Sequence, residues 1–460
     1  MYRIVLPDNH VNERRYICDV LFKEFLGLEY TIEFNRHVSN NFIYCDEKYV
    51  ELNDEFFAYP DEYWLKTESM PKDRGIFFFN SDFFSEYKGE DNLPIIFGNS
   101  DFQVMEKHLY VGLDILGSCF FMLSRYEEYV IKKRDKFDRF DYKDSIAYKN
   151  NFLDRPIVNE YIEILWCAIK SICSNAKRRQ TNYTVLPTHD IDKPFGILYD
   201  SKWQIIRHFV GDILYKRGYK TSYKRLKNIF HRCYSPQYFI KQGNEVFDFV
   251  INLSRCYNLK NIFFFMNSKK TCLDGNYYVD YPDVKKLLEK VIAAGHTVGL
   301  HPSYDSYLNP KEIAKESAHI SNVLRNIQNG RLVGGRQHYL RWNNPITWQA
   351  YESAGLKMDS TLTFAGHVGF RCGVCYPYTV YDVVNRKTLG IKEMPLIVMD
   401  GTLFEYMHLS HDQALKICEK LARKCRRYNG YFVFLWHNTM LYTEENRKFY
   451  KKLLESVTNG

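Results

Sequence analysis

The sequence predicts an α/β protein of two domains, with a largely parallel sheet in the second domain. After residue 182, seven short apolar runs recur, and helical patterns or loops separate most of them. Strands that alternate with helices are typical of a parallel sheet. In the first 175 or so residues, short apolar segments mix with longer helical ones, which indicates a smaller α+β domain. The length of 460 residues also favours two domains over one.

The N-terminal domain is expected at residues 1–178. Its short strand-like segments read RIVLP, YTIEF, NFIYC, GIFFF and PIIFG. Helix-like stretches follow at residues 111–132 and 156–173, and the second has apolar residues at the spacing of one helix face. The stretch SNAKRRQTN, residues 174–182, is polar and basic, so we expect the domain boundary there.

The C-terminal domain is expected at residues 179–460. Its seven strand-like runs are YTVLPTHD, NIFFFMN, HTVGLHP, RLVGGRQH, LKMDSTL, KEMPLIVM and YFVFLWHN. Helical patterns cover residues 281–294, 309–328, 346–354 and 412–428. Seven such strands indicate either a barrel or a doubly wound sheet.

A basic helical insertion is predicted at about residues 198–240. Between Lys202 and Arg232 the chain has nine Lys or Arg residues and a single acid, Asp212. The apolar residues between these charges predict amphipathic helices packed on the C-terminal domain. The alternative is a basic patch for an anionic substrate or a membrane surface.

Composition and charge argue against several classes of protein. The formal charge of +8 is modest for this length, so we expect a solvated basic surface and no nucleic-acid partner. The N-terminus lacks the apolar core of a signal peptide, and no run of 18 apolar residues occurs. We therefore expect a cytoplasmic protein without a transmembrane segment. The twelve scattered cysteines are expected as reduced thiols, including Cys372 and Cys375 in the single CxxC motif.

Ionisable side chains follow most of the predicted C-terminal strands. The carboxyl ends of parallel strands lie at one edge of a sheet, so groups that follow these strands are expected to meet. Five of the seven runs end in such groups: His189, Asp190 and Asp192; His301 and Asp305; Arg336, His338 and Arg341; Asp359; and His437. The coincidence of five strands predicts an active or metal-binding site at that edge.

The first strand end supplies a pair of carboxylates. Asp190 and Asp192 are two residues apart, so an extended chain directs both to one side and His189 to the other. Two such carboxylates can divide the work, one binding a cation and the other accepting a proton. The alternative is a pair of turn-capping aspartates before Pro194.

The later strand ends supply basic groups. His301 is expected either as a metal ligand or as a histidine hydrogen-bonded to the sheet edge. Arg336 can orient a carboxylate through its planar fork, and His338 lies on the same side. His437 ends a nearly all-apolar strand and is either a catalytic acid or a satisfied core histidine. Arg371 lies in a loop, where its role is open.

These motifs resemble those of the polysaccharide deacetylase superfamily (NodB homology, carbohydrate esterase family 4). THDID at 188–192 resembles the first motif, which implies Asp190 as base and Asp192 as metal ligand. GHTVGLHPSYD at 295–305 resembles the second and places His301 and Asp305 at ligand positions. RQHY at 336–339 resembles the arginine motif, with His338 where proline is usual. LWH at 435–437 resembles the last motif loosely.

The resemblance implies a distorted (β/α) barrel and a metal-dependent deacetylase. Its substrate would be an acetylated amino sugar of a bacterial surface polysaccharide or its precursor, and its metal a divalent cation, with zinc expected. The implied residues are Asp192, His301 and Asp305 as ligands, with His189 or His338 as substitutes; Asp190, Arg336 and His437 in catalysis; and Tyr339 and Arg371 as further candidates for binding the substrate.

The N-terminal part also carries a resemblance. The segments DILGSCFFMLSRYEEY and RPIVNEY resemble the N-terminal domain found with such deacetylase-like proteins. Two alternative functions remain for the whole chain. One is a non-catalytic carbohydrate-binding or scaffolding descendant of the enzyme. The other is a glycosyltransferase, because a D-x-D sequence after a strand can hold a metal-bound nucleotide diphosphate.

Overall fold

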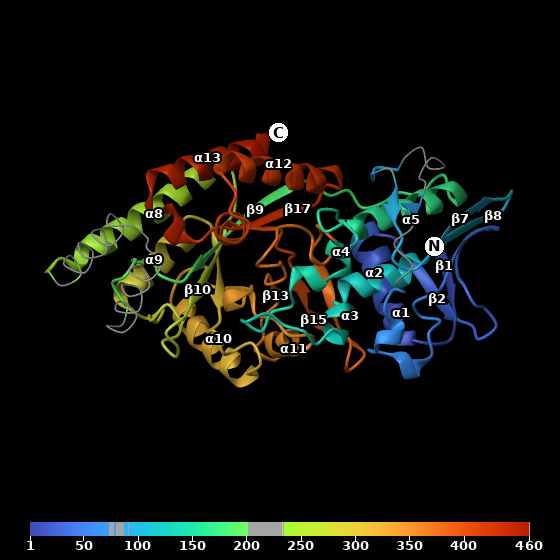
Figure 1. Ribbon diagram of the computed structural model, residues 1–460, viewed down its shortest axis with the longest axis horizontal. Helices are drawn as coiled ribbons and strands as arrows, with labels where there is room; N and C mark the ends of the chain where they lie inside the picture. The colour runs from blue at the N-terminus through green and yellow to red at the C-terminus, as the bar shows by residue number, and fades with distance from the viewer. Residues whose placement is uncertain (73–77, 80–86, 91, 201–231, 233, 460) are drawn as a thin grey trace.

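The computed structural model describes residues 1–72, 78–79, 87–90, 92–200, 232 and 234–459. Most of the basic insertion predicted at about residues 198–240 lies outside the described residues. The described chain contains two large sheets, one formed by N-terminal strands and one by C-terminal strands (Figure 1). The fold is therefore of the mixed α/β type that the sequence predicts.

Six described strands form the N-terminal sheet, in the order β2-β1-β3-β4-β8-β7. Their bounds are β1 Tyr2–Leu6, β2 Tyr30–Phe34, β3 Asn41–Cys45, β4 Lys48–Leu52, β7 Gly98–Val104 and β8 His108–Leu113. A separate short pair joins β5 (Phe78–Phe79) to β6 (Leu93–Pro94). In the large sheet, β1–β2 and β4–β8 pair in parallel and the other neighbours antiparallel, as expected for an α+β unit.

Three helices pack beside this sheet. They are α1 (Val11–Cys18), α2 (Ile115–Leu123) and α5 (Ile157–Ile172). Helix α5 contacts β4 and β8 and confirms the helix predicted at residues 156–173. All residues of α2 are buried, in keeping with a sequence that is apolar except for Ser118.

The single helix predicted at residues 111–132 is wrong. The strand β8 continues to Leu113, and two helices follow it, α2 and α3 (Tyr126–Val130). Arg125 interrupts the helices with a φ of 52°, the left-handed region. In that position its guanidinium donates to Glu127 and Glu128, so buried ion pairing outweighs helix continuity. The short helix α4 (Ile146–Lys149) follows.

Nine described strands form the C-terminal sheet, in the order β14-β15-β13-β12-β11-β10-β9-β17-β16. Their bounds are β9 Thr184–Ile191, β10 Ile262–Met266, β11 Thr297–His301, β12 Leu332–Gly335, β13 Met358–Asp359, β14 Tyr378–Asp382, β15 Lys387–Glu393, β16 Val398–Met399 and β17 Tyr431–Leu435. Only the β14–β15 pair is antiparallel among these described strands. The parallel sheet predicted for this part is confirmed.

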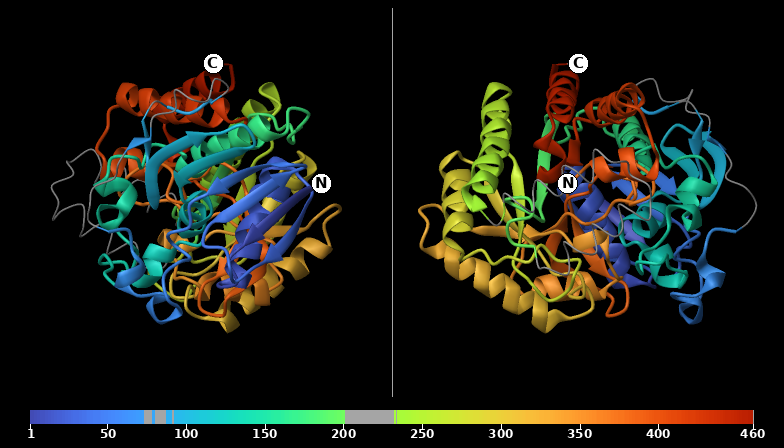
Figure 2. Two further views of the ribbon diagram at one scale, coloured as in Figure 1. Left: turned by 90° about the vertical axis from the view of Figure 1, so that its right-hand side faces the viewer. Right: turned by 60° about the vertical axis from the view of Figure 1, so that its left-hand side comes forward.

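Helices surround this second sheet (Figure 2). They are α8 (Pro236–Cys256), α9 (Pro282–Ala293), α10 (Pro310–Arg325), α11 (Ile346–Ser353), α12 (His411–Arg427) and α13 (Glu444–Asn459). All five residues of β10 are buried, as expected for a strand with both faces covered. No helix in the described part of the chain is both long and apolar enough to cross a membrane.

The sixth predicted strand is divided between two places in the sheet. Its first residues end β15, next to β13, and its last residues form β16, next to β17. Four residues lie between Glu393 and Val398, so the chain between these two residues spans at most about 18 Å. In the strand order, β15 and β16 are seven positions apart, so in a flat sheet these two strands would be about 34 Å from each other. The sheet is therefore strongly curled, but β14 and β16 form no pair that closes it into a barrel.

Candidate active site

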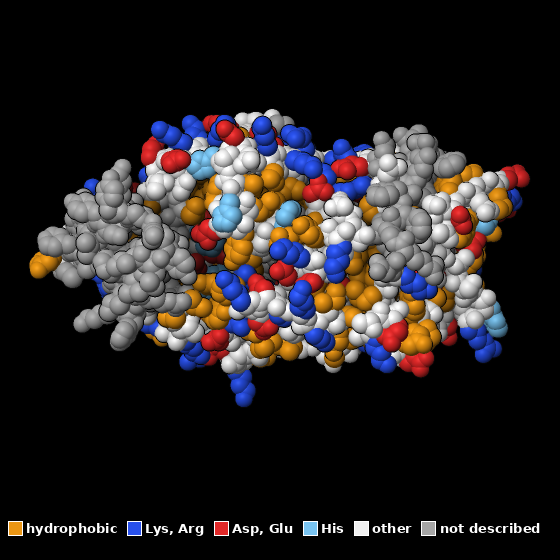
Figure 3. Space-filling view, viewed as in Figure 1, with side chains coloured by type: hydrophobic (Ala, Val, Ile, Leu, Met, Phe, Trp, Pro, Cys, Tyr) orange, Lys and Arg blue, Asp and Glu red, His pale blue; other side chains and the backbone are white. Residues whose placement is uncertain are grey.

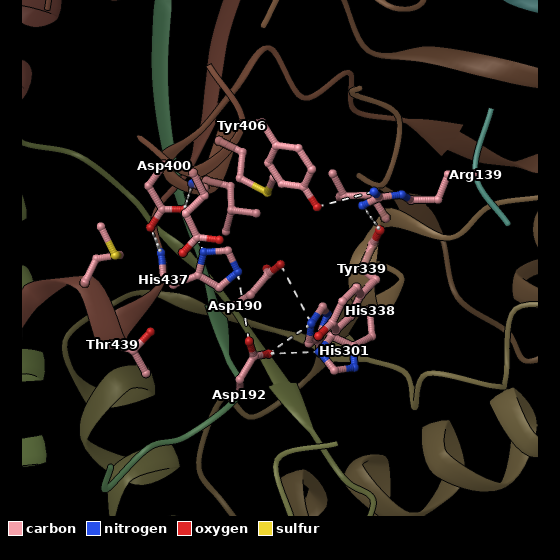
Figure 4. Close-up of a pocket in the computed structure, with 16 residues that line it drawn as sticks. Arg139, Asp190, Asp192, His301, His338, Tyr339, Asp400, Tyr406, His437 and Thr439 are labelled. Carbon is pink, nitrogen blue, oxygen red and sulfur yellow. Dashed lines mark hydrogen bonds and ion pairs between the residues drawn. The ribbon is translucent and has the colours of Figure 1, made fainter. Parts of the chain in front are cut away.

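A pocket of about 260 Å³ lies at the carboxyl ends of the C-terminal strands (Figure 4). The space-filling view shows a hollow on this face, with histidine and acidic side chains at its edge (Figure 3). Its lining includes Asp190 from β9 and Asp192 directly after it, His301 from β11, His338 after β12, and Asp400 and His437 after β16 and β17. The sheet order brings these strand ends together, as the sequence predicts.

Three side chains converge as candidate metal ligands. Asp192, His301 and His338 each offer one ligand atom, and these atoms lie within 4.8 Å of one another. Oδ1 of Asp192 is 3.2 Å from Nε2 of His301 and 3.8 Å from Nε2 of His338. Two imidazoles and one carboxylate form a donor set that suits a divalent metal such as zinc.

The surroundings of these three residues fit a metal ion. The Nδ1 of His301 lies 2.6 Å from the carbonyl oxygen of Arg336, so Nδ1–H donates and the Nε2 lone pair faces the pocket. The Nδ1 of His338 lies 3.6 Å from Oδ1 of Asp274. Oδ1 of Asp192 is buried and has no hydrogen-bond partner among the described residues. A cation would satisfy that oxygen, so the residues present fit the metal that the sequence implies.

Asp190 lies beside this cluster and is held by Arg336. Its Oδ1 accepts a hydrogen bond from Nη1 of Arg336 at 3.0 Å, and its Oδ2 lies 3.8 Å from Nε2 of His301. The buried guanidinium also donates to Thr188 and to the backbone and hydroxyl oxygens of Ser360. With Arg336 fixed in this way, one oxygen of Asp190 is anchored and the other faces the pocket.

His437 and Asp400 form a pair on the opposite side of the pocket (Figure 4). Asp400 accepts from Nδ1 of His437 at 2.6 Å and from the backbone N–H of His437 at 2.7 Å. Burial opposes protonation of the imidazole, but the charge of Asp400 outweighs it and raises the pKa of His437 to about 10. Nε2 of His437 lies 4.0 Å from Oδ2 of Asp192. The pair therefore favours a protonated imidazole at His437, next to the candidate ligands.

The charges of the cluster also shift its other pKa values. Burial alone would raise the pKa of Asp192, but the neighbouring His301, His338 and His437 lower it well below its usual range. Burial likewise opposes protonation of His301, but Asp190 and Asp192 raise its pKa. The carboxylates of this pocket thus attract positive charge, whether as protons or as a cation.

Asp400 was missed in the sequence. It directly follows the predicted run KEMPLIVM and is fully buried. The other site residues are predicted because they are ionisable groups at strand ends. Asp400 meets the same criterion, because it directly follows β16.

The structure does not place Asp305 with the candidate ligands. Its side chain is 69% exposed and pairs with Arg341 at 3.1 Å. Asp305 lies four residues beyond the end of β11, in a turn that directs it to solvent, so strand geometry does not control its direction. His338, considered as a substitute ligand, lies in the cluster instead.

His189 does not face the pocket either. It stacks on Phe263 with ring centroids 4.9 Å apart, and its Nδ1 lies 2.8 Å from the carbonyl of Trp436. Burial lowers its pKa to about 3, so it is a neutral core histidine. The opposite facing of His189 and Asp190 follows the alternation of a strand, as predicted.

The remaining predicted residues divide between the pocket and the core. Tyr339 lines the pocket. Arg371 does not line it; its buried guanidinium binds the carboxylate of Glu128 and the carbonyl of Thr363. Cys372 and Cys375 are buried free thiols.

Comparison with known proteins gives a family match for the N-terminal part. Residues 3–174 match the model of a family of unknown function, DUF7033. No curated protein matches the chain.

Two solved structures show distant similarity. One, from Mycobacterium smegmatis and assigned as a polysaccharide deacetylase, is 15% identical with a TM-score of 0.39; the match covers 61% of this chain and 85% of that chain. The other, from Bordetella bronchiseptica and assigned as a polysaccharide deacetylase involved in O-antigen biosynthesis, is 13% identical with a TM-score of 0.23 and coverages of 55% and 71%. Similarity at this level does not define a function. Any functional assignment therefore depends on the geometry of the site.

Proposed function

We propose that the protein is a metal-dependent deacetylase of an acetylated amino sugar in a surface polysaccharide or its precursor. The observation that carries the proposal is the arrangement around one pocket. Asp192, His301 and His338 converge on one point, with the Asp190–Arg336 pair beside them and the Asp400–His437 pair opposite. Hydrolysis of an amide needs a group that accepts a proton and another that donates one, and the two pairs supply them.

In this proposal Asp192, His301 and His338 hold a divalent cation, with zinc expected. Such a cation polarises the acetyl carbonyl and lowers the pKa of the attacking water. Asp190 accepts the proton of that water at Oδ2, because Arg336 engages Oδ1. Arg336 is thus a positioning residue for the base.

His437 donates a proton to the amine that leaves when the C–N bond breaks. Asp400 engages Nδ1, so Nε2 is the ring atom that donates. The same contact favours the protonated imidazole that a general acid requires. The products are acetate and the free amino sugar, and the carboxylate of Asp400 keeps the ring in place during the transfer.

The Asp190→Asn variant tests this proposal. We expect acetate release from N-acetylglucosamine oligomers to fall by roughly 10²-fold or more, because the base is lost. The zinc content of the purified variant should equal that of the wild type, because Asp190 is not a ligand. Acetate assay and elemental analysis measure the two quantities.

Asp192→Asn is the companion variant. We expect it to lose both zinc and activity, because it removes the central ligand of the cluster. Asp190→Asn with full activity would refute the assigned roles. A wild-type protein that holds no stoichiometric metal and releases no acetate would instead indicate a non-catalytic carbohydrate-binding protein.

A further inference from the structure

A segment of the N-terminal part forms a wall of the candidate active site. Residues 131–145, between α3 and α4, extend from the N-terminal part toward the C-terminal sheet (Figure 1). Arg139 of this segment lines the same pocket as Asp190 and His437, although all the candidate ligands come from the C-terminal part (Figure 4). The pocket therefore depends on both parts of the chain.

Arg139 is fixed in this wall by contacts on both sides. Its Nε donates to Oδ2 of Asp135 at 2.9 Å within the segment. Its two Nη atoms donate across the boundary, to the carbonyl of Tyr339 at 3.2 Å and to the hydroxyl of Tyr406 at 3.3 Å. The hydroxyl of Tyr307 donates to Asp138 and gives a second link to the C-terminal part. The segment is thus bound to loops that surround the site.

A second cavity of about 250 Å³ lies next to the pocket. Arg139, Leu340 and Tyr406 line both, so the two cavities adjoin at these residues. The segment supplies half of the second cavity and the C-terminal part the other half: Asp135, Phe140, Asp141, Tyr142 and Lys143 face Thr363, Ala365, Gly366 and Arg371.

The lining of the second cavity suits a sugar. Tyr142 supplies an aromatic ring, held by contact with His367 and Tyr148 at centroid distances of 5.4 and 4.7 Å. Aromatic rings present flat apolar faces, and the hydroxyl of Tyr406 and the carboxylate of Asp141 are polar groups beside them. Gly366 permits the close approach of Tyr142, because a Cβ there would lie 2.6 Å from the ring.

We propose that the second cavity is a subsite for the neighbouring sugar unit of a carbohydrate chain. The acetylated unit occupies the pocket beside Asp192, and the next unit lies against Tyr142 of the N-terminal part. Each cavity is smaller than the roughly 300–1,000 Å³ that encloses a drug-sized ligand, so the adjoining pair suits a chain of two or more units. The inference rests on the proposed function and gives the N-terminal part a role in substrate binding.

Binding to metal-free, full-length protein tests this subsite without catalysis. Calorimetry compares N-acetylglucosamine with its β-1,4-linked dimer and trimer. We expect the dimer and the trimer to bind at least about 10-fold more tightly than the monomer, because only a chain of two or more units reaches Tyr142. Tyr142→Ala should weaken trimer binding by roughly 5-fold and leave monomer binding unchanged, as expected for loss of one aromatic contact.

Two further variants make the test specific. Tyr142→Leu keeps an apolar side chain without the ring and should also weaken trimer binding, which guards against a folding defect in Tyr142→Ala. Tyr278→Ala removes a tyrosine that is 36% exposed and lines neither cavity, and it should bind the trimer like the wild type.

The outcomes separate this inference from the proposed function. Equal affinity for monomer and trimer, or no oligomer binding, would overturn the subsite even if acetate is released. Tight trimer binding that depends on Tyr142 would support the subsite even if no acetate is released, and the proposed deacetylase function alone would then fail.

Discussion

Two groups of buried ionisable side chains differ in how their polar atoms are satisfied. The Arg–Glu cluster consists of Arg125, Glu127 and Glu128 from the N-terminal part and Arg371 from the C-terminal part, each with a side chain at most 2% exposed. The carboxylate oxygens of the two glutamates are all matched by N–H donors. Glu128 accepts from both arginines, and Glu127 accepts from Arg125 and from the backbone of Ile146. The protein itself satisfies these charges.

The candidate ligand cluster is arranged differently. Oδ1 of Asp192 is buried without a hydrogen-bond partner among the described residues, and the Nε2 atoms of His301 and His338 face it from the pocket. Buried charges that the protein pairs stabilise one conformation, whereas buried polar atoms left open toward a cavity indicate a ligand. The contrast predicts that the first cluster governs stability and the second governs binding.

Breaking the Arg–Glu cluster should give the largest effect on stability. In Arg371→Met, Glu128 keeps only Arg125 and becomes a poorly compensated buried charge. We expect a loss of about 3–5 kcal/mol in the free energy of unfolding, measured by urea titration. The zinc content of the folded protein should not change.

Lys451→Met provides the matched control for Arg371→Met. It removes an exposed ion pair with Glu455, in which the two side chains are 57% and 46% exposed. Such a change should cost no more than about 1 kcal/mol. If Arg371→Met cost as little, the Arg–Glu cluster would not govern stability.

Acid should weaken the same cluster. Burial alone would raise the pKa of Glu128, but the charges of Arg371 and Arg125 outweigh burial and lower this pKa from 4.5 to about 2. A carboxylate with a depressed folded-state pKa contributes stability above its unfolded pKa, and this contribution is lost as pH falls from about 5 toward 2. The contribution is about 3 kcal/mol.

Unfolding measured from pH 6 down to pH 2 checks this contribution. The stability difference between the wild type and Glu128→Gln should shrink as pH falls, because both then carry an uncharged side chain. A difference that is constant with pH would contradict the assigned ion pairing.

The smallest predicted effect concerns the ligand cluster and affects binding. Asp274 accepts from the backbone N–H groups of Thr271 and Tyr304 and lies 3.6 Å from Nδ1 of His338. Asp274→Asn should weaken zinc affinity by about 10- to 100-fold, because the carboxylate orients His338. Competition with a chelator measures this affinity.

Asp305→Asn is the control for Asp274→Asn. Its exposed side chain pairs with Arg341 away from the cluster, so zinc affinity should equal that of the wild type. A large loss of zinc in Asp305→Asn would indicate that Asp305 is a metal ligand. It would contradict the assignment of His338 as the third ligand.

Much of the candidate site is predictable because strand geometry is local. Side chains alternate along an extended chain, so the two-residue spacing alone places Asp190 and Asp192 on one side and His189 on the other. The carboxyl ends of neighbouring parallel strands share an edge, which brings His301, His338 and His437 to them. The same reasoning extends to Asp400, which follows β16.

Loops and turns are less predictable because distant contacts decide their direction. The turn at Arg125 depends on Glu128, which also binds Arg371, 243 residues further along the chain. No local pattern in residues 111–132 signals that break. The division of KEMPLIVM between β15 and β16 likewise follows from the curl of the whole sheet.

Local sequence patterns are enough to predict the alternation of strands and helices and the faces on which the strand-end residues lie. Contacts between distant segments bring His338, and not Asp305, to Asp192 and His301, and place Arg139 of the N-terminal part at the pocket. The two cases differ in how far apart in the sequence the deciding contacts lie. The direction of a side chain in a strand is set by its immediate neighbours, whereas the direction of a loop depends on contacts such as that of Arg139 with Tyr339, 200 residues away.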